Sequence, residues 1–235
     1  MQQYLIAHAA QMGISLSPEQ AEEFCRYHFL LTEANKVMNL TRVSEEISEA
    51  CDRNYLDSLT LLPYLEGVTT LVDVGSGAGF PGIPLAIMRR DIKITLLDSL
   101  GKRVDFLNSV IKDLGLNAEA VHIRCEDAAK LPRYRDAFDV ATARAVAELN
   151  VLSEWLLPFV KVGGRMLALK GLSASEEMQN AQNAIKELGG SPIGVHAAQI
   201  PGRDWQHALV EIKKIKPTPK KYPRKAGTAQ KTPIV

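Results

Sequence analysis

The sequence has little cysteine and no long hydrophobic run. Its three cysteines, Cys25, Cys51 and Cys125, lie far apart without a C-x-x-C pair, so neither a disulfide framework nor a zinc knuckle is indicated. No apolar run reaches the roughly 18 residues of a membrane span, and the first residues lack the basic stretch of a secretory signal. The five histidines show no metal-binding spacing. We therefore expect a cytoplasmic protein without a metal site or a membrane partner.

Acidic residues are absent from the C-terminal segment, although the net charge of the chain is only +1. From position 213 onward there are eight basic residues, which leaves 20 basic against 27 acidic residues, a net charge of −7, in the rest of the chain. The eight are Lys213, Lys214, Lys216, Lys220, Lys221, Arg224, Lys225 and Lys231. Charge segregated in this way indicates a partner.

The prolines of this segment predict an extended arm rather than a helix. Its lysines and arginines suit the phosphates of RNA, and Tyr222 is a candidate for stacking on a base. The alternative is a flexible tail that only improves solubility.

The length of 235 residues and the hydrophobic share of 46% are typical of one globular domain with an appendage. We predict an N-terminal helical extension at 1–66, a core domain at 67–215 and a basic Pro/Lys-rich C-terminal arm at 216–235. In the extension, Ser17-Pro18-Glu19-Gln20 has the pattern of a helix capping box. Residues 35–41 are polar enough to form a loop, and Ser44 is a candidate cap for a second long helix.

The stretch from Leu71 to Pro84, LVDVGSGAGFPGIP, predicts a buried strand, a glycine-rich turn and a helix. A dinucleotide fingerprint would place its third glycine at position 80, which is Phe80. The pattern found is D-V-G-x-G-x-G, which resembles motif I of the class I methyltransferases. Its residues are Asp73, Gly75, Gly77 and Gly79. Asp73 would favour a cationic ligand and oppose a pyrophosphate, whereas an ordinary tight turn between strand and helix is the alternative.

Strands and helices alternate after position 71, which predicts a doubly wound, Rossmann-like parallel sheet. Seven strands are expected, at residues 71–74, 93–97, 120–123, 138–142, 166–169, 193–200 and 207–215. The helices expected between them are the one after the glycine turn, up to about Arg90, and those at 101–114, 149–158 and 175–188.

Polar residues follow each of the first four predicted strands, namely Asp73, Asp98, Glu126 and Arg144. Ligands of open α/β sheets bind beyond these strand ends. Asp98 lies 19 residues after Gly79, the spacing at which an acid binds ribose hydroxyls. Cys125 and Glu126 would then border an adenine. Taken singly, each could equally be a solvated loop residue.

Two motifs missing from the sequence limit which atoms could accept a methyl group. The chain has no [D/N]-P-P-[Y/F] motif for adenine amino groups, and no cysteine follows a proline, as pyrimidine carbon methylation would need. The N7 atom of guanine has a free lone pair and requires no general base, so alignment would supply most of the rate. Arg144 and Lys170 are candidate catalytic residues that would hold such a guanine.

The chain resembles the ribosomal RNA small subunit methyltransferase G family over nearly its whole length. The resemblance lies in VDVGSGAGFPGIP, LLDSLGKRVDFL, ARAVAELNVL and LALKG, with NKVMNLT and YLDSLT upstream. It implies a class I methyltransferase fold, S-adenosylmethionine as methyl donor and N7 of one guanosine in the 530 loop of 16S rRNA as acceptor. The cofactor contacts that it implies are Gly75, Phe80, Cys125, Glu126 and Arg144.

The resemblance has one departure, at Asn54, where the family usually has histidine. An asparagine can donate a hydrogen bond but cannot carry a proton. The implied partner is the small ribosomal subunit or its assembly intermediate, and we expect a monomer. A nicotinamide oxidoreductase is an alternative, disfavoured by Phe80 and by the lack of a Tyr-x-x-x-Lys pair. A non-catalytic RNA-binding protein is another, disfavoured by the intact glycine pattern.

Overall fold

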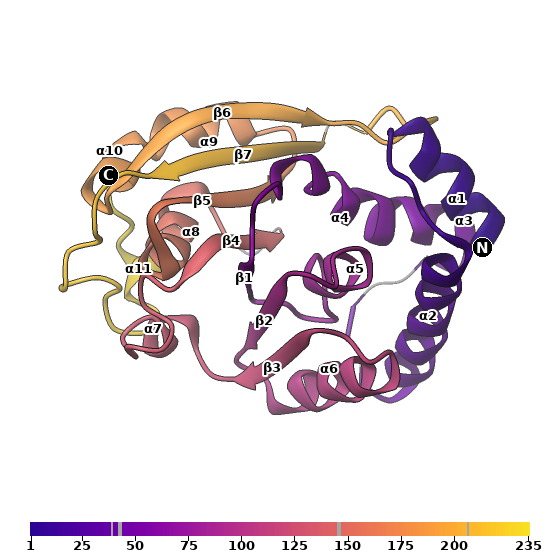
Figure 1. Ribbon diagram of the computed structural model, residues 1–235. Helices are drawn as coiled ribbons and strands as arrows, with labels where there is room; N and C mark the ends of the chain where they lie inside the picture. Colours follow the sequence, from indigo (N-terminus) through magenta and orange to yellow (C-terminus); the bar gives the residue numbers. More distant parts are fainter. Residues whose placement is uncertain (39, 42–43, 145–146, 206) are drawn as a thin grey trace.

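The computed structural model describes residues 1–38, 40–41, 44–144, 147–205 and 207–235. A seven-stranded sheet with the order β3-β2-β1-β4-β5-β7-β6 runs through its centre (Figure 1). The strands are β1 (Thr70–Val74), β2 (Lys93–Asp98), β3 (Ala118–His122), β4 (Phe138–Arg144), β5 (Val160–Lys170), β6 (Gly190–Ala198) and β7 (His207–Lys214). β1 to β5 pair in parallel, whereas β7 pairs antiparallel with both β5 and β6. The predicted doubly wound sheet of seven strands is confirmed, but it is mixed rather than parallel throughout, because β7 runs antiparallel to its neighbours.

Helices cover both faces of the sheet, because successive residues of the central strand point to opposite sides. Leu71 belongs to a core shared with the N-terminal helices, α5 (Gly82–Met88) and α6 (Gly101–Asp113). Val72 belongs to a second core, shared with α8 (Leu149–Leu156) and α10 (Gln182–Glu187). This alternation is the period of two expected of a strand buried on both faces. Also on this side are α7 (Cys125–Ala128), η3 (Leu157–Phe159) and α9 (Ala174–Asn180).

The N-terminal region is helical and packed on the sheet domain, at the right of Figure 1. It comprises α1 (Gln2–Gln11), α2 (Pro18–Met38), α3 (Ile47–Ala50), the π-helix η1 (Cys51–Leu56), α4 (Asp57–Leu59) and η2 (Leu62–Tyr64). The predicted capping box is present: the Ser17 amide donates to Gln20 Oε1 at 3.0 Å, and the Gln20 amide donates to Ser17 Oγ at 3.2 Å.

Two predictions for this region are wrong. Residues 35–38 continue α2 instead of forming a loop, because Ala34 and Met38 extend its apolar face onto the core; position 39 lies outside the described residues. Ser44 does not cap the next helix, which begins at Ile47 after Glu46. The Ser44 hydroxyl donates instead to Glu49.

The second half of the sheet also differs in detail from the prediction. β5 begins at Val160, so the predicted turn at 162–165 is an irregularity within the strand, with Gly163 at φ +93°. The single helix predicted at 175–188 is two helices, α9 and α10, which meet at the fully buried Ala181.

The C-terminal segment is not the helix-free arm that its prolines predicted. It packs beside α7 and α8 and contains a short helix, α11 (Thr228–Lys231) (Figure 1). Tyr222 is only 6% exposed, and its hydroxyl donates to Glu187 at 2.8 Å. Its predicted stacking on an RNA base is therefore contradicted, because the ring is part of the second core.

Candidate active site

The glycine loop after β1 lies at the switch point of the sheet, where β1 has β2 on one side and β4 on the other. The Gly75 and Ser76 amides donate to Leu97 O at 2.8 and 3.2 Å, which ties the loop to β2. The Gly77 amide donates to Asp98 Oδ2 at 2.9 Å. The sequence thus brings its glycine motif and the acid of the next strand into direct contact.

Two of the three motif glycines have different roles. Gly77 has φ +57°, and a Cβ there would point into open space, with only Gly75 O as near as 3.9 Å. Gly79, with φ +110°, faces the protein interior, where a Cβ would meet Ile83, Tyr27 and Leu107 within 3 Å. Gly77 therefore leaves the loop open to a ligand, and Gly79 allows the helices to pack against it.

A cavity of about 280 Å³ opens beside this loop. Four of the predicted cofactor-binding residues line it, namely Gly75, Asp98, Cys125 and Glu126. It is also lined by residues that the sequence did not single out for this site: Val74, Leu97, Ser99, Arg103, Ile123, Arg124, Trp155, Gly227 and Gln230. Carboxylates at the ends of β2 and in α7 can accept hydrogen bonds from ribose hydroxyls and an amino group. Burial and the neighbouring Glu126 raise the pKa of the Cys125 thiol, which excludes it as a nucleophile at neutral pH.

Asp73 lies beneath the loop and is fully buried. Its Oδ2 accepts the Gly82 amide at 3.0 Å, whereas its Oδ1 has no hydrogen-bond partner among the described residues. Burial raises the pKa of this carboxyl group to about 7. A cationic group bound nearby would favour the ionised form, so the orphaned oxygen fits the predicted cofactor, S-adenosylmethionine.

The other predicted cofactor residues, Phe80 and Arg144, form a separate group at the end of β4. The Arg144 guanidinium lies over the Phe80 ring, 4.6 Å from its centre. It donates to Arg53 O at 2.7 Å and lies 3.5 Å from Asp57 Oδ2. Asn54, the residue at which the chain departs from the family pattern, accepts from Arg144 at 3.4 Å. These contacts fix the guanidinium in one orientation.

The charge of Lys170, the second predicted catalytic residue, is balanced by an acid of the protein itself. Its ammonium lies 2.6 Å from Glu177 and donates to Ala147 O at 2.7 Å. Glu177 also accepts the Leu149 amide at 2.9 Å. Lys170 thus holds the chain after β4 against α9, and the predicted contact with a substrate would require these bonds to be exchanged.

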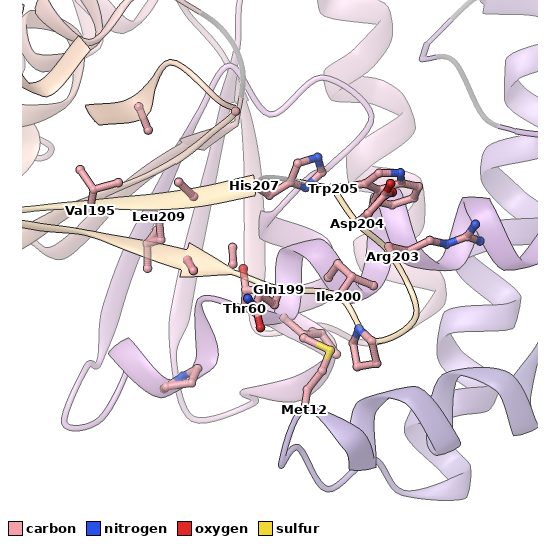
Figure 2. Close-up of a pocket in the computed structure, with 18 of the residues that line it drawn as sticks. Met12, Thr60, Val195, Gln199, Ile200, Arg203, Asp204, Trp205, His207 and Leu209 are labelled. Carbon is pink, nitrogen blue, oxygen red and sulfur yellow. The ribbon is translucent and has the colours of Figure 1, made fainter. Parts of the chain in front are cut away.

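A second, larger cleft of about 1040 Å³ lies between the β6–β7 hairpin and the N-terminal helices (Figure 2). Arg203, Asp204 and Trp205 lie on the connection between these strands. The Arg53 and Arg203 guanidinium carbons are 4.2 and 5.1 Å from the centre of the Trp205 ring. The sequence did not predict this aromatic and cationic cluster, because Trp205 and Arg53 are distant along the chain.

His207 connects this cleft to Arg144. Its ring stacks on Trp205 with centres 5.7 Å apart, and its Nδ1 lies 2.8 Å from Asp57 Oδ1. This hydrogen bond with Asp57 raises the pKa of His207. Asp57 also lies 3.5 Å from Arg144, so this buried carboxylate joins the wall of the cleft to the end of β4.

Metal-binding clusters of three or more His, Cys, Asp or Glu are not found in the part of the chain that the structure describes. Within the same residues, no helix has the length and apolar character needed to cross a membrane.

Comparison with known proteins identifies close relatives along the whole chain. The family model described as rRNA small subunit methyltransferase G matches residues 20–205. A protein of that name from Clostridium botulinum (strain Eklund 17B / Type B) is 48% identical over 234 residues, which covers 98% of each chain. Another from Lactobacillus johnsonii is 44% identical over 232 residues, with 96% of each chain covered.

Solved structures with low sequence identity share the fold. One, a geranyl diphosphate methyltransferase in complex with SAM, has a TM-score of 0.52 at 15% identity, and the match covers 67% of this chain and 84% of that one. The geranyl diphosphate C-methyltransferase of Streptomyces coelicolor A3(2) has a TM-score of 0.51 at 13% identity, with 80% and 98% covered. The predicted class I methyltransferase fold is thereby confirmed.

The buried carboxyl of Asp73 predicts that binding of S-adenosylmethionine is linked to pH. Its pKa of about 7 lies above the ordinary 3.8, so the stability it contributes is present at low pH and lost as pH rises through about 7. A cation bound nearby stabilises the ionised carboxylate of Asp73, so its binding releases the proton of this group. We expect cofactor affinity to rise between pH 6 and pH 8 by up to about 10-fold, the equivalent of one pKa unit.

Calorimetric titration of wild type and Asp73→Asn measures this linkage. The cofactor's own amine titrates in both experiments and cancels from the comparison. We expect the asparagine variant to show a flatter pH profile and to release fewer protons. Identical profiles for the two proteins would contradict a cationic ligand near Asp73.

Proposed function

This chain belongs to the rRNA small subunit methyltransferase G family, and from that premise we propose that it methylates N7 of one guanosine in the 530 loop of 16S rRNA. Methylation of ribosomal RNA with S-adenosylmethionine as cofactor is the activity of this family. The proposal adds the position of the methyl group and places the reaction in the cytoplasm. The two alternatives, a nicotinamide oxidoreductase and a non-catalytic RNA-binding protein, receive no support from relatives that are named methyltransferases.

The hydrogen bond between the Gly77 amide and Asp98 is the observation that carries the cofactor placement in this proposal. It sets the glycine loop beside the cavity that contains Asp98 and Glu126. We assign the adenosine to these carboxylates and the methionine portion to the loop above Asp73. Bound there, the cofactor supplies a methyl group activated by its sulfonium. Arg144, held at the end of β4, would hold the acceptor of this methyl group.

Four residues of the N-terminal helices offer no base for deprotonating the acceptor, although Asp57 and its partner His207 lie close to Arg144. Burial raises the pKa of Cys51 to about 12, and burial also raises the pKa of Tyr27 and Tyr55 well above the usual value. Asn54 cannot take up a proton. None of these four residues can act as a base or nucleophile near pH 7. Guanine N7 satisfies this constraint, because its lone pair is available without proton transfer.

Arg144 is proposed to position the guanine rather than to move a proton. Its guanidinium always carries a charge, and it is fixed by Phe80, Asp57 and the Arg53 carbonyl. The carbonyl oxygen O6 next to N7 is a hydrogen-bond acceptor, and a single bond from arginine to O6 alone would leave the N7 lone pair free. A fixed donor at the end of β4 would thus select guanine and align N7 with the methyl group.

The cleft that contains Trp205 is proposed to hold nucleotides that flank the target. RNA is recognised sequence-specifically in single-stranded segments, where unstacked bases lie on aromatic rings or guanidinium planes. Trp205, Arg53 and Arg203 supply both kinds of surface, and Asp57 joins them to Arg144. The loop of a ribosomal RNA provides such unpaired bases.

Trp205→Ala tests this path for the RNA. We expect the KM for small-subunit particles to rise about 10-fold, since stacking of one base contributes about 1–3 kcal/mol. The dissociation constant for the cofactor should stay unchanged, which separates loss of RNA contact from misfolding. Phe29→Ala is the matched control, because Phe29 is an exposed aromatic residue on α2 outside the cleft. An unchanged KM for Trp205→Ala would contradict the proposed path.

Methyl transfer to small-subunit particles that lack 7-methylguanosine tests the proposed position. Labelled S-adenosylmethionine is incubated with the particles, and the labelled nucleotide is identified and mapped in 16S rRNA. We expect one 7-methylguanosine within the 530 loop. A label on another atom or in another loop would overturn the proposed specificity and keep only the assignment as an rRNA methyltransferase.

A further inference from the structure

The C-terminal segment is anchored to the domain at several points between Lys214 and Gly227. The Arg135 guanidinium donates to three of its carbonyl oxygens, those of Thr218 at 2.8 Å, Tyr222 at 2.9 Å and Pro219 at 3.3 Å. Lys214, fully buried at the end of β7, donates to Thr218 Oγ1 at 2.6 Å. The turn that leads away from β7 is therefore fixed by two cations of the core domain.

A second set of anchors lies further along the segment. Arg224 forms an ion pair with Glu154 at 2.6 Å, and its backbone amide also donates to this carboxylate at 2.8 Å. Glu154 belongs to α8 and is only 1% exposed, so its buried negative charge depends on the positive charge of Arg224. Lys221 pairs with Glu187. Three of the eight basic residues, Lys214, Lys221 and Arg224, are thus engaged with acids of the domain.

These anchors bring residues 227–230 to the mouth of the smaller cavity. The Gly227 amide donates to Glu126 Oε1 at 3.2 Å, although the two residues are 101 positions apart. Gly227 and Gln230 both line the cavity. Ala229 is buried where α11 packs on α8, which fixes the side of α11 that faces the cavity.

We propose that the C-terminal segment forms the adenine end of the cofactor site, with the Gly227 amide orienting Glu126 and the Gln230 carboxamide contacting the base. The inference rests on the proposed placement of S-adenosylmethionine. The exocyclic amino group of adenine is a donor, and its ring nitrogens are acceptors. A carboxamide offers both a donor and an acceptor and can pair with such an edge. The segment thus serves the cofactor, in place of the free RNA-binding arm that its charge predicted.

Binding of S-adenosylhomocysteine, which cannot react, measures the contribution of Gln230 without any turnover. We expect Gln230→Ala to weaken binding about 5- to 10-fold, the effect of one hydrogen bond. Lys231→Ala is the matched control, because Lys231 is exposed on the same helix and does not line the cavity. Both substitutions should leave the melting temperature of the free protein unchanged, since both side chains are exposed.

A truncation after Ala226 removes α11 but keeps Tyr222 and Arg224. We expect it to bind S-adenosylhomocysteine at least as weakly as Gln230→Ala. The analogue S-inosylhomocysteine, in which an oxygen replaces the adenine amino group, tests recognition of the base. Wild type should bind it more weakly than the adenine form, and Gln230→Ala should narrow that difference.

Asp98→Ala separates failure of this inference from failure of the proposed function. If Asp98→Ala loses about 10-fold or more in affinity while Gln230→Ala and the truncation bind as wild type, the cofactor site stands and the C-terminal segment has no part in it. If wild type does not bind S-adenosylhomocysteine, the proposed function itself fails. Equal loss in Gln230→Ala and Lys231→Ala would also overturn the inference, because it would indicate a general effect on α11.

Discussion

The hydrogen bond from the Gly77 amide to the Asp98 carboxylate joins the two strands on which the site depends. Positive φ angles at Gly75 and Gly77 bring the loop after β1 back toward the end of β2. Asp98 also accepts the Leu100 amide at 2.9 Å, so one buried carboxylate fixes both the glycine loop and the start of α6. The cavity, the orphaned oxygen of Asp73 and the guanidinium of Arg144 take their positions around this junction.

The sequence predicted the parts of the site that follow from local patterns. A short apolar run before alternating glycines defined β1 and its loop, and strand ends placed Asp98, Glu126 and Arg144 on one edge of the sheet. Periodicity also predicted seven strands and the helices around them. Boundaries were less predictable, because packing of Met38 prolongs α2 and an irregularity in β5 absorbs the turn expected at residues 162–165.

Contacts between distant segments could not be predicted from the sequence. The prolines and lysines at the C-terminus indicated an extended cationic arm, since composition contains no information about the positions of Glu154 and Glu187 in the folded domain. The ion pairs with these acids turn the segment back onto the cavity. The cluster of Trp205 with Arg53 is similarly non-local. The place of Lys170 at the end of β5 indicated a contact with guanine, but Glu177 compensates its charge.

Amide hydrogen exchange with and without S-adenosylhomocysteine tests the location of the cofactor most directly. We expect ligand-dependent protection at residues 75–79, 98–100 and 125–127 and at 227–231, and little change in the hairpin around Trp205. Protection confined to the larger cleft, with none in the glycine loop, would contradict the account.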